Sequence, residues 1–258
     1  MSARGRLRGA LVAALLLLFP VEGAPQTALD QVRAPLARLH EDPAGVDRAR
    51  DTLEALLRQA PEAKATPAAT AEMLALLARI HFLDGDLRAT SPDARLAAYE
   101  RGREAGKRAV ELAPDSAQAH LWFALNSGRW AEANGILKSL ALLPTLRREA
   151  ELILKLDPRL PEGHSLAGSL AANLPVLLGG DKAKAERHFL EAMRLAPNLT
   201  GTRVELAKFY IATGRHAEAR TELQRVVDER DPKNPAHWTL RDLPRAVELL
   251  RSLPEATN

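Results

Sequence analysis

The sequence predicts an all-α protein built as a solenoid of about five helix pairs, closed by a C-terminal capping helix. Three observations support this fold class. The 258 residues are 46% hydrophobic but only 4% aromatic, and Ala and Leu dominate, which is typical of closely packed helices. Strand-forming runs of Val, Ile and Thr are almost absent. One spacing of small and apolar residues recurs along the chain, with turn and capping residues at its ends.

The clearest copy of this spacing runs from Asp181 to Pro197. Asp181 follows two glycines and is a favourable N-cap, because its carboxylate can accept from the free amides of the first helical turn. Ala185, Phe189 and Ala192 then fall on one helical face. Pro197 cannot continue the helix. The stretch therefore predicts a turn, an amphipathic helix and a stop.

The same spacing recurs in four further stretches. They are Ala49, Leu53, Leu56 and Pro61; Gly102, Gly106, Ala109 and Pro114; Leu146, Ala150, Ile153 and Pro158; and Ala219, Leu223 and Val226 with the proline one residue late at Pro232. Five helices of one geometry predict an array of helix pairs in which each unit buries its face on its neighbours. The small residue of each copy should then touch an adjacent helix.

Residues 1–23 predict a cleaved secretory signal peptide, with an uncleaved N-terminal anchor as the alternative. Three arginines precede an apolar run of ten residues, 10–19, which is short for a bilayer core of ~30 Å. Val21 and Gly23 are small enough for cleavage before Ala24. Because the chain has no cysteine, it carries no site for N-terminal lipid attachment. We expect an exported protein, located in the bacterial periplasm.

The remainder, 24–258, is predicted as one helical repeat domain. Its pairs are expected at 28–62, 68–114, 115–158, 159–197 and 198–232, with the capping helix at 243–253. In the first pair Leu36, Ala37 and His40 take the packing positions of the first helix, and Gly45 marks the turn.

The second pair is predicted to be longer than the first. A strongly apolar helix covers 71–82, a loop is inserted at 85–92, and Ser91 or Asp93 caps the next helix. Gly102 and Gly106 lie inside that second helix, where each costs about 1 kcal/mol relative to alanine. We expect a close helix crossing as their reason.

The last three pairs are bounded by prolines and glycines. In the third, 135–143 is an intervening stretch before a helix at 144–156. In the fourth, the first helix ends at Asn173, because Pro175 follows. After the fifth pair, 233–241 is expected to be a loop, and Asp242 should cap the final helix.

The sequence contains no recognisable catalytic centre. It lacks the motifs of zinc proteases, serine hydrolases and nucleotide-binding loops, and its seven histidines are scattered. The absence of cysteine excludes a thiolate metal site and a cysteine nucleophile. We therefore predict no catalytic residues, no metal and no cofactor. The formal charge is +3, and removing residues 1–23, with their three arginines and one glutamate, leaves +1, which gives no electrostatic argument for nucleic acid.

One helical face combines aromatic and polar residues. Trp122, Asn126, Arg129 and Trp130 follow at helical spacing. They could line a groove or pocket, since aromatics supply contact area and Arg or Asn can hold a polar group. Alternatively, both tryptophans fill a gap in the core.

The repeated spacing resembles the tetratricopeptide (TPR) superfamily over about 28–232. Residues 120–124 and 174–189 also resemble the T component associated with TRAP transporters, which is thought to bind small ligands, and the regulator of microtubule dynamics family. The T component is commonly a lipoprotein, which this chain cannot be without a cysteine. On these resemblances His120, Trp122 and Asn173 become candidate site residues, and His164 joins them, although the sequence favours structural helix-face roles for both histidines.

Together with the export expected from residues 1–23, the TPR resemblance implies a non-enzymatic exported protein that binds a partner protein or peptide in a concave groove. The groove would be lined by the first helices of the pairs, at 68–82, 118–131, 163–174 and 201–212. The alternative is a small-ligand-binding accessory protein of a TRAP-type transport system. An enzyme is the third hypothesis, and neither nucleic acid nor a membrane span of the mature chain is expected.

Overall fold

The computed structural model describes residues 24–254, and within them all regular structure is helical. The first elements are α1 (Ala24–Ala37), α2 (Pro43–Gln59), α3 (Pro67–Leu83), the π-helical turn η1 (Asp84–Arg88), α4 (Pro92–Leu112), α5 (Ala117–Ala133) and α6 (Ile136–Leu156). They are followed by α7 (Pro161–Asn173), η2 (Val176–Leu178), α8 (Lys182–Leu195), α9 (Thr200–Ala212), α10 (His216–Val227), α11 (Pro235–His237), the π-helical turn η3 (Trp238–Asp242) and α12 (Leu243–Ser252). The predicted fold class, a TPR-like solenoid with a capping helix, is confirmed.

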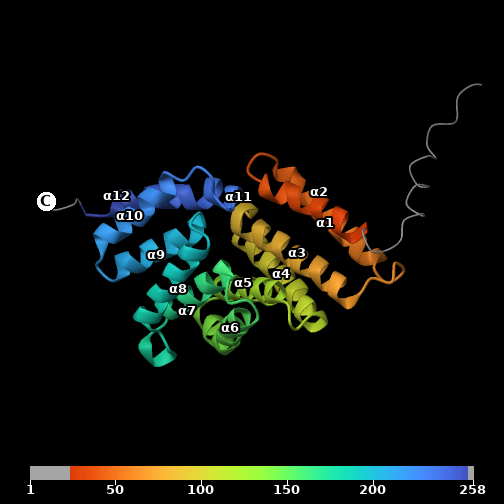
Figure 1. Cartoon of the computed structure of the whole chain (residues 1–258), viewed down its shortest axis with the longest axis horizontal. Coiled ribbons are helices and arrows are strands. Elements are labelled where there is room, and N and C mark those ends of the chain that lie inside the picture. The colour runs from red at the N-terminus through yellow and green to blue at the C-terminus, as the bar shows by residue number, and fades with distance from the viewer. Residues whose placement is uncertain (1–23, 255–258) are drawn as a thin grey trace, which may run out of the picture.

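Consecutive helices pack as antiparallel hairpins that follow one another around an arc (Figure 1). The first helices of the pairs, α3, α5, α7 and α9, also contact one another along the stack. We call the side of the solenoid that these four helices form the inner face. The second helices lie outside, and α12 packs on α10 at the end of the array.

The two ends of the arc meet. Helix α11 lies against α1, and Ala236 is 3% exposed within the same apolar cluster as Leu29 and Val32 of α1. Figure 1 shows α11 beside the end of α3, at the opening between the first and last hairpins. The solenoid is therefore closed by contacts between segments about two hundred residues apart in sequence, which a local repeat pattern does not predict.

The small residues of the repeated spacing mark close helix contacts, as expected. Ala49, Gly102, Ala150, Ala185 and Ala219 are all buried. A Cβ at Gly106 would lie 2.7 Å from the Cα of Phe123, so α4 and α5 touch backbone to backbone there. Glycine is required at this crossing for reasons of space, since the helical backbone itself would accept alanine.

Two predicted caps are present. The side chains of Ser91 and Asp181 accept from the backbone amides of Ala94 and Lys184 at the starts of α4 and α8. The expected cap at Asp242 was wrong. Asp242 has helical backbone angles at the end of η3, and its buried carboxylate accepts instead from the hydroxyl of Thr200 at 2.8 Å.

Three stretches expected to lie between helices are partly or wholly helical. The stretch 135–143 belongs to α6, which begins at Ile136 and carries Pro144 inside it. Proline removes one helical hydrogen bond, whose acceptor would be Leu140, and Leu140 is 42% exposed, so water can replace the lost donor. The expected loop at 85–92 contains most of η1. The expected loop at 233–241 contains α11 and most of η3.

Within residues 24–254, no helix is both long enough and apolar enough to cross a bilayer.

Candidate interaction surface on the inner face

Trp122 is half-buried at the seam between α3 and α5. Its ring lies 5.8 Å from that of Phe82, centroid to centroid, and it packs on the small apolar cluster that includes Leu74 and Ala109. The guanidinium of Arg79, on α3, lies 5.8 Å from the centroid of the tryptophan ring. Trp122 thus contributes to packing and also presents an aromatic surface beside a cation.

Arg79 has no ion pair or side-chain hydrogen bond among the side chains that the structure describes. Burial lowers its pKa, and this effect outweighs the attraction of Glu162. Because the ordinary pKa of arginine is far above neutrality, the guanidinium still carries its charge. A half-buried guanidinium that forms no ion pair with a described side chain is a natural contact for a carboxylate or phosphate.

A few residues further along the same face lies an ionic cluster, which we call the Asp86 cluster: Asp86, Arg129, His237, Arg241 and Asp242. The Asp86 side chain is 7% exposed and forms ion pairs with Arg129 at 3.4 Å, with His237 at 3.4 Å and with Arg241. Burial alone would raise the pKa of Asp86, but the hydrogen bond from His237 and the two arginines lower it well below its usual range. Asp86 is therefore ionised at any physiological pH.

Both ends of this cluster are held by π-helical turns. Asp86 belongs to η1 and Arg241 to η3, and the two turns are 155 residues apart in sequence. An extra residue in a helical turn redirects the side chains that follow, and such turns are frequent at functional sites. Here they bring Asp86 and Arg241 together where the two ends of the solenoid meet.

The two arginines of the cluster remain accessible. The side chains of Arg129 and Arg241 are 36% and 33% exposed, whereas Asp86 between them is nearly covered. Burial lowers the pKa of Arg129, but the charges of Asp86 and Glu132 raise it further than burial lowers it. The inner face therefore presents two partly exposed guanidinium groups around a buried carboxylate, close to Arg79 and Trp122.

The remaining predicted residues do not join this surface. Asn126 is fully buried, and its Nδ2 donates to the carbonyl oxygens of Ala78 at 3.0 Å and Trp122 at 2.8 Å. It fills the space over Gly102 and links α3, α4 and α5, so its assignment to a groove was wrong for a physical reason: its position on α5 points into the helix crossing.

Trp130 points away from Trp122. Its ring lies 4.8 Å from the guanidinium carbon of Arg103, on α4, whereas Trp122 faces α3. The two tryptophans share a helix but line different seams, because eight residues turn the helix by about 80°. Asn173 is exposed at the end of α7, beside the turn to η2.

His120 and His164 serve a repeated structural purpose. Nε2 of His120 contacts the carbonyl oxygen of Pro114 at 3.0 Å, and Nδ1 lies 2.5 Å from Glu149 of α6. With His120 only 3% exposed, its proposed place in a groove is corrected. His164 repeats the arrangement, with Pro158 at 3.0 Å and His188 of α8 at 3.1 Å.

Arg203 is the third member of this series and was not identified from the sequence. Its Nε donates to the carbonyl oxygen of Pro197 at 2.9 Å, and its Nη1 donates to Glu222 of α10. The signal is present in the sequence as a proline followed six residues later by His, His or Arg. Each such residue ties the turn between two pairs to the second helix of the next pair.

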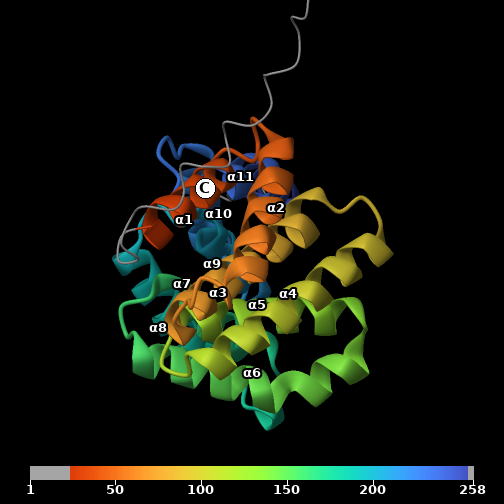
Figure 2. The same cartoon turned by 90° about the vertical axis from the view of Figure 1, so that its right-hand side faces the viewer.

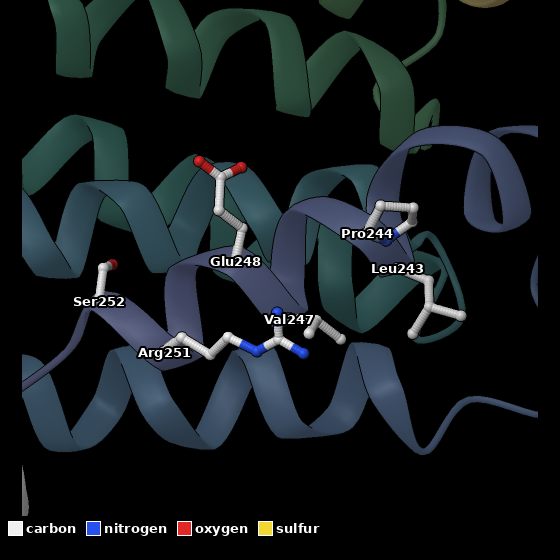
Figure 3. Close-up of a pocket in the computed structure, with 6 residues that line it drawn as sticks. All are labelled: Leu243, Pro244, Val247, Glu248, Arg251 and Ser252. Atoms are coloured by element: carbon white, nitrogen blue, oxygen red, sulfur yellow. The ribbon is translucent and has the colours of Figure 1, made fainter.

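No group of three or more His, Cys, Asp or Glu side chains within residues 24–254 is arranged to hold a metal ion. A surface pocket of about 620 Å³ lies elsewhere, along α12, and is lined by Leu243, Pro244, Val247, Glu248, Arg251 and Ser252 (Figure 3). These residues all come from α12, the last helix within the described residues, and none belongs to the inner-face surface.

The fold and this surface define a TPR-type helical repeat protein, a class that generally mediates protein interactions and is typically non-enzymatic. A tetratricopeptide repeat model matches residues 177–243. A solved thermophilic TPR protein from Thermus thermophilus shares the fold, with a TM-score of 0.59 and 21% identity over 85% of this chain and 99% of that one.

The chain belongs to the family of regulator of microtubule dynamics protein 1-3, whose model matches residues 37–174. Regulator of microtubule dynamics protein 3 from Mus musculus is 27% identical in an alignment of 158 residues that covers 55% of this chain and 34% of the mouse protein. The Rattus norvegicus protein is 28% identical in an alignment of 135 residues that covers 46% of this chain and 29% of the rat protein. The chain thus spans about a third of the length of each of these relatives.

Proposed function

We propose that the protein is a non-enzymatic interaction module that binds an extended, acidic segment of a partner protein on its inner face. The observation that carries this proposal is Arg79, a half-buried guanidinium without an acidic partner among the described side chains, held beside Trp122. A backbone laid along α3 and α5 would place an Asp or Glu side chain against this guanidinium and an apolar one against the ring.

The Asp86 cluster extends the same chemistry along the face. Arg129 and Arg241 are each about a third exposed although they share Asp86, so an incoming carboxylate can bond to their free edges without displacing it. A basic peptide would meet three arginines and be repelled. Charge sign is thus the expected basis of selection, and affinity should fall with added salt.

The test uses short fluorescent peptides of acidic, neutral and basic composition, with fluorescence anisotropy as the readout. We expect only the acidic peptides to bind, and we expect Arg79→Gln to weaken their binding by about tenfold or more. Arg101→Gln, on the exposed outer side of α4, is the matched control and should bind as the parent does. Parent-like binding by a folded Trp122→Ala/Arg129→Ala double variant would place the site elsewhere.

We also propose that residues 1–23 direct export to the bacterial periplasm and that 24–258 is one repeat domain. The support is the order of charged, apolar and small residues before Ala24. Periplasmic extraction followed by N-terminal sequencing should find a chain that starts at Ala24. A chain that retains Met1 in the membrane fraction would favour the anchor instead. The transport-accessory hypothesis stays a prediction.

A further inference from the structure

Two segments of the chain expose large aliphatic side chains to solvent. In the turn between α7 and α8, Val176 is 83% and Leu177 is 98% exposed. At the start of α6, Ile136 is 72% and Leu137 is 79% exposed, and Leu140 follows at 42%. Single exposed leucines are ordinary, but this concentration is not.

The two segments lie on the same side of α6. The turn packs on α6 at Arg147, since a Cβ at Gly179 would clash with the guanidinium of Arg147. Ile136 and Leu140 share a helical face with Arg147, and Leu140 lies two turns, or about 10 Å, along the helix from it. Figures 1 and 2 both place the turn beside α6 at the lower edge of the molecule. We call Ile136, Leu137, Leu140, Val176, Leu177 and Leu178 the apolar tip.

The residues around the apolar tip are mainly basic. The stretches 136–148 and 174–187 contain six Lys or Arg and only two acidic residues. Both acidic side chains are engaged: Asp181 caps α8, and Glu186 pairs with Arg215 at 2.8 Å. Lys138, Lys182 and Lys184 are exposed, and Arg148 is 74% exposed although it pairs with the buried Glu149 at 3.8 Å. The rim of the tip is therefore positive, while the whole chain is close to neutral.

We propose that the apolar tip is a membrane-docking surface that inserts into the outer part of an anionic lipid bilayer. Leu177 is 98% exposed, so it is free to enter a bilayer, and the basic rim around it matches anionic lipid headgroups. The lysines and arginines would contact anionic headgroups, while the aliphatic side chains would be buried among the first carbons of the acyl chains. The tip shares no residue with Arg79 or the Asp86 cluster, so this inference does not depend on the proposed peptide binding.

The test is co-sedimentation of the full chain with vesicles of phosphatidylcholine containing about one third phosphatidylglycerol, and with pure phosphatidylcholine. Because the apolar run at 10–19 could itself bind lipid, all proteins carry Leu15→Glu and Leu17→Glu. We expect binding to the anionic vesicles, with at least about tenfold less protein bound to the neutral ones, and a loss of binding at high salt.

Val176→Ser/Leu177→Ser should reduce the vesicle partition coefficient by about tenfold or more, and Lys182→Glu/Lys184→Glu should do so on anionic vesicles. Leu112→Ser, at a 39% exposed leucine on α4, is the matched control and should leave partitioning unchanged. Equal partitioning of parent and Val176→Ser/Leu177→Ser would overturn the proposal. So would sedimentation velocity showing a dimer that the same variant dissociates, because the tip would then be an interface between two copies.

Discussion

The crossing of α4 and α5 allows a prediction with opposite signs at two glycines. Gly106 and Gly128 both lie inside helices, and replacing either by alanine should gain about 1 kcal/mol of helix propensity. What differs is the space around the new methyl group. At Gly106 it would lie 2.7 Å from the Cα and 2.9 Å from the backbone N of Phe123, whereas at Gly128 the nearest atom would be a methyl of Leu146 at 3.9 Å.

The size of the effect follows from which atoms must move. A clash with a flexible side chain is relieved by rotation, but the backbone of Phe123 can retreat only if α5 separates from α4. Overpacking of this kind costs typically about 1–3 kcal/mol. Set against the propensity gain, Gly106→Ala should destabilise the protein by up to about 2 kcal/mol, and Gly128→Ala should stabilise it by up to about 1 kcal/mol.

The assay is urea unfolding followed by far-UV circular dichroism for the parent and the two variants. The comparison rests on transition midpoints, since a repeat array need not unfold in one step. Midpoints that shift in opposite directions are expected. If both variants shift to higher urea concentration, the two helices are not in backbone contact at Gly106, and the explanation of the glycines as a close crossing is wrong.

Three further predictions concern charged groups. Burial lowers the pKa of His81 from 6.5 to about 4, so stability is full above pH 6.5 and falls as the pH drops towards 4; unfolding at pH 5 should show a loss of about 2 kcal/mol that His81→Leu removes. His164 and His188 face each other, and burial together with the charge of His164 lowers the pKa of His188. The stability of the protein should therefore decline as the pH falls below the ordinary pKa of histidine. His188→Glu should reverse that decline, as measured by thermal unfolding at pH 5 and 7.5. Asp86→Asn leaves Arg241 and its neighbours without their counter-charge and should cost about 3 kcal/mol, with faster hydrogen exchange in 235–242.

Each of these has a clear contrary result. A His81→Leu variant that loses stability on acidification as steeply as the parent would mean that another group titrates. A His188→Glu variant less stable than the parent at pH 5 would mean that the histidine pair already tolerates protonation. Unchanged exchange in 235–242 after Asp86→Asn would show that apolar contacts alone hold the two ends of the solenoid together.

Much of the fold could be predicted because the interactions that build it are local. A helix pair is specified by residues close in sequence: a cap such as Asp181, a small residue such as Ala185, an apolar one such as Phe189. Phe189 is 1% exposed and rests on Gly168 of the preceding helix. Since every pair repeats this geometry, one spacing read five times predicts the whole stack.

The candidate site was only partly predictable. Trp122 and Arg129 lie at the inner face, whereas Asn126 and Trp130, on the same helix, turn into neighbouring seams. A spacing places residues on one face of an isolated helix, and it does not tell which neighbouring helix covers each part of that face. Arg79 was missed because nothing near it in sequence marks an arginine without an acidic partner.

By itself, the sequence determined the class of fold, the succession of helix pairs and the glycines at their crossings, because capping, helix periodicity and side-chain volume act over a few residues. Only the tertiary structure decided that the solenoid closes on itself, that the π-helical turns η1 and η3 bring Asp86 to Arg241, and that the apolar tip stays uncovered. Those features depend on the accumulated curvature of the stack, a sum of small rotations between pairs that no single stretch of sequence records.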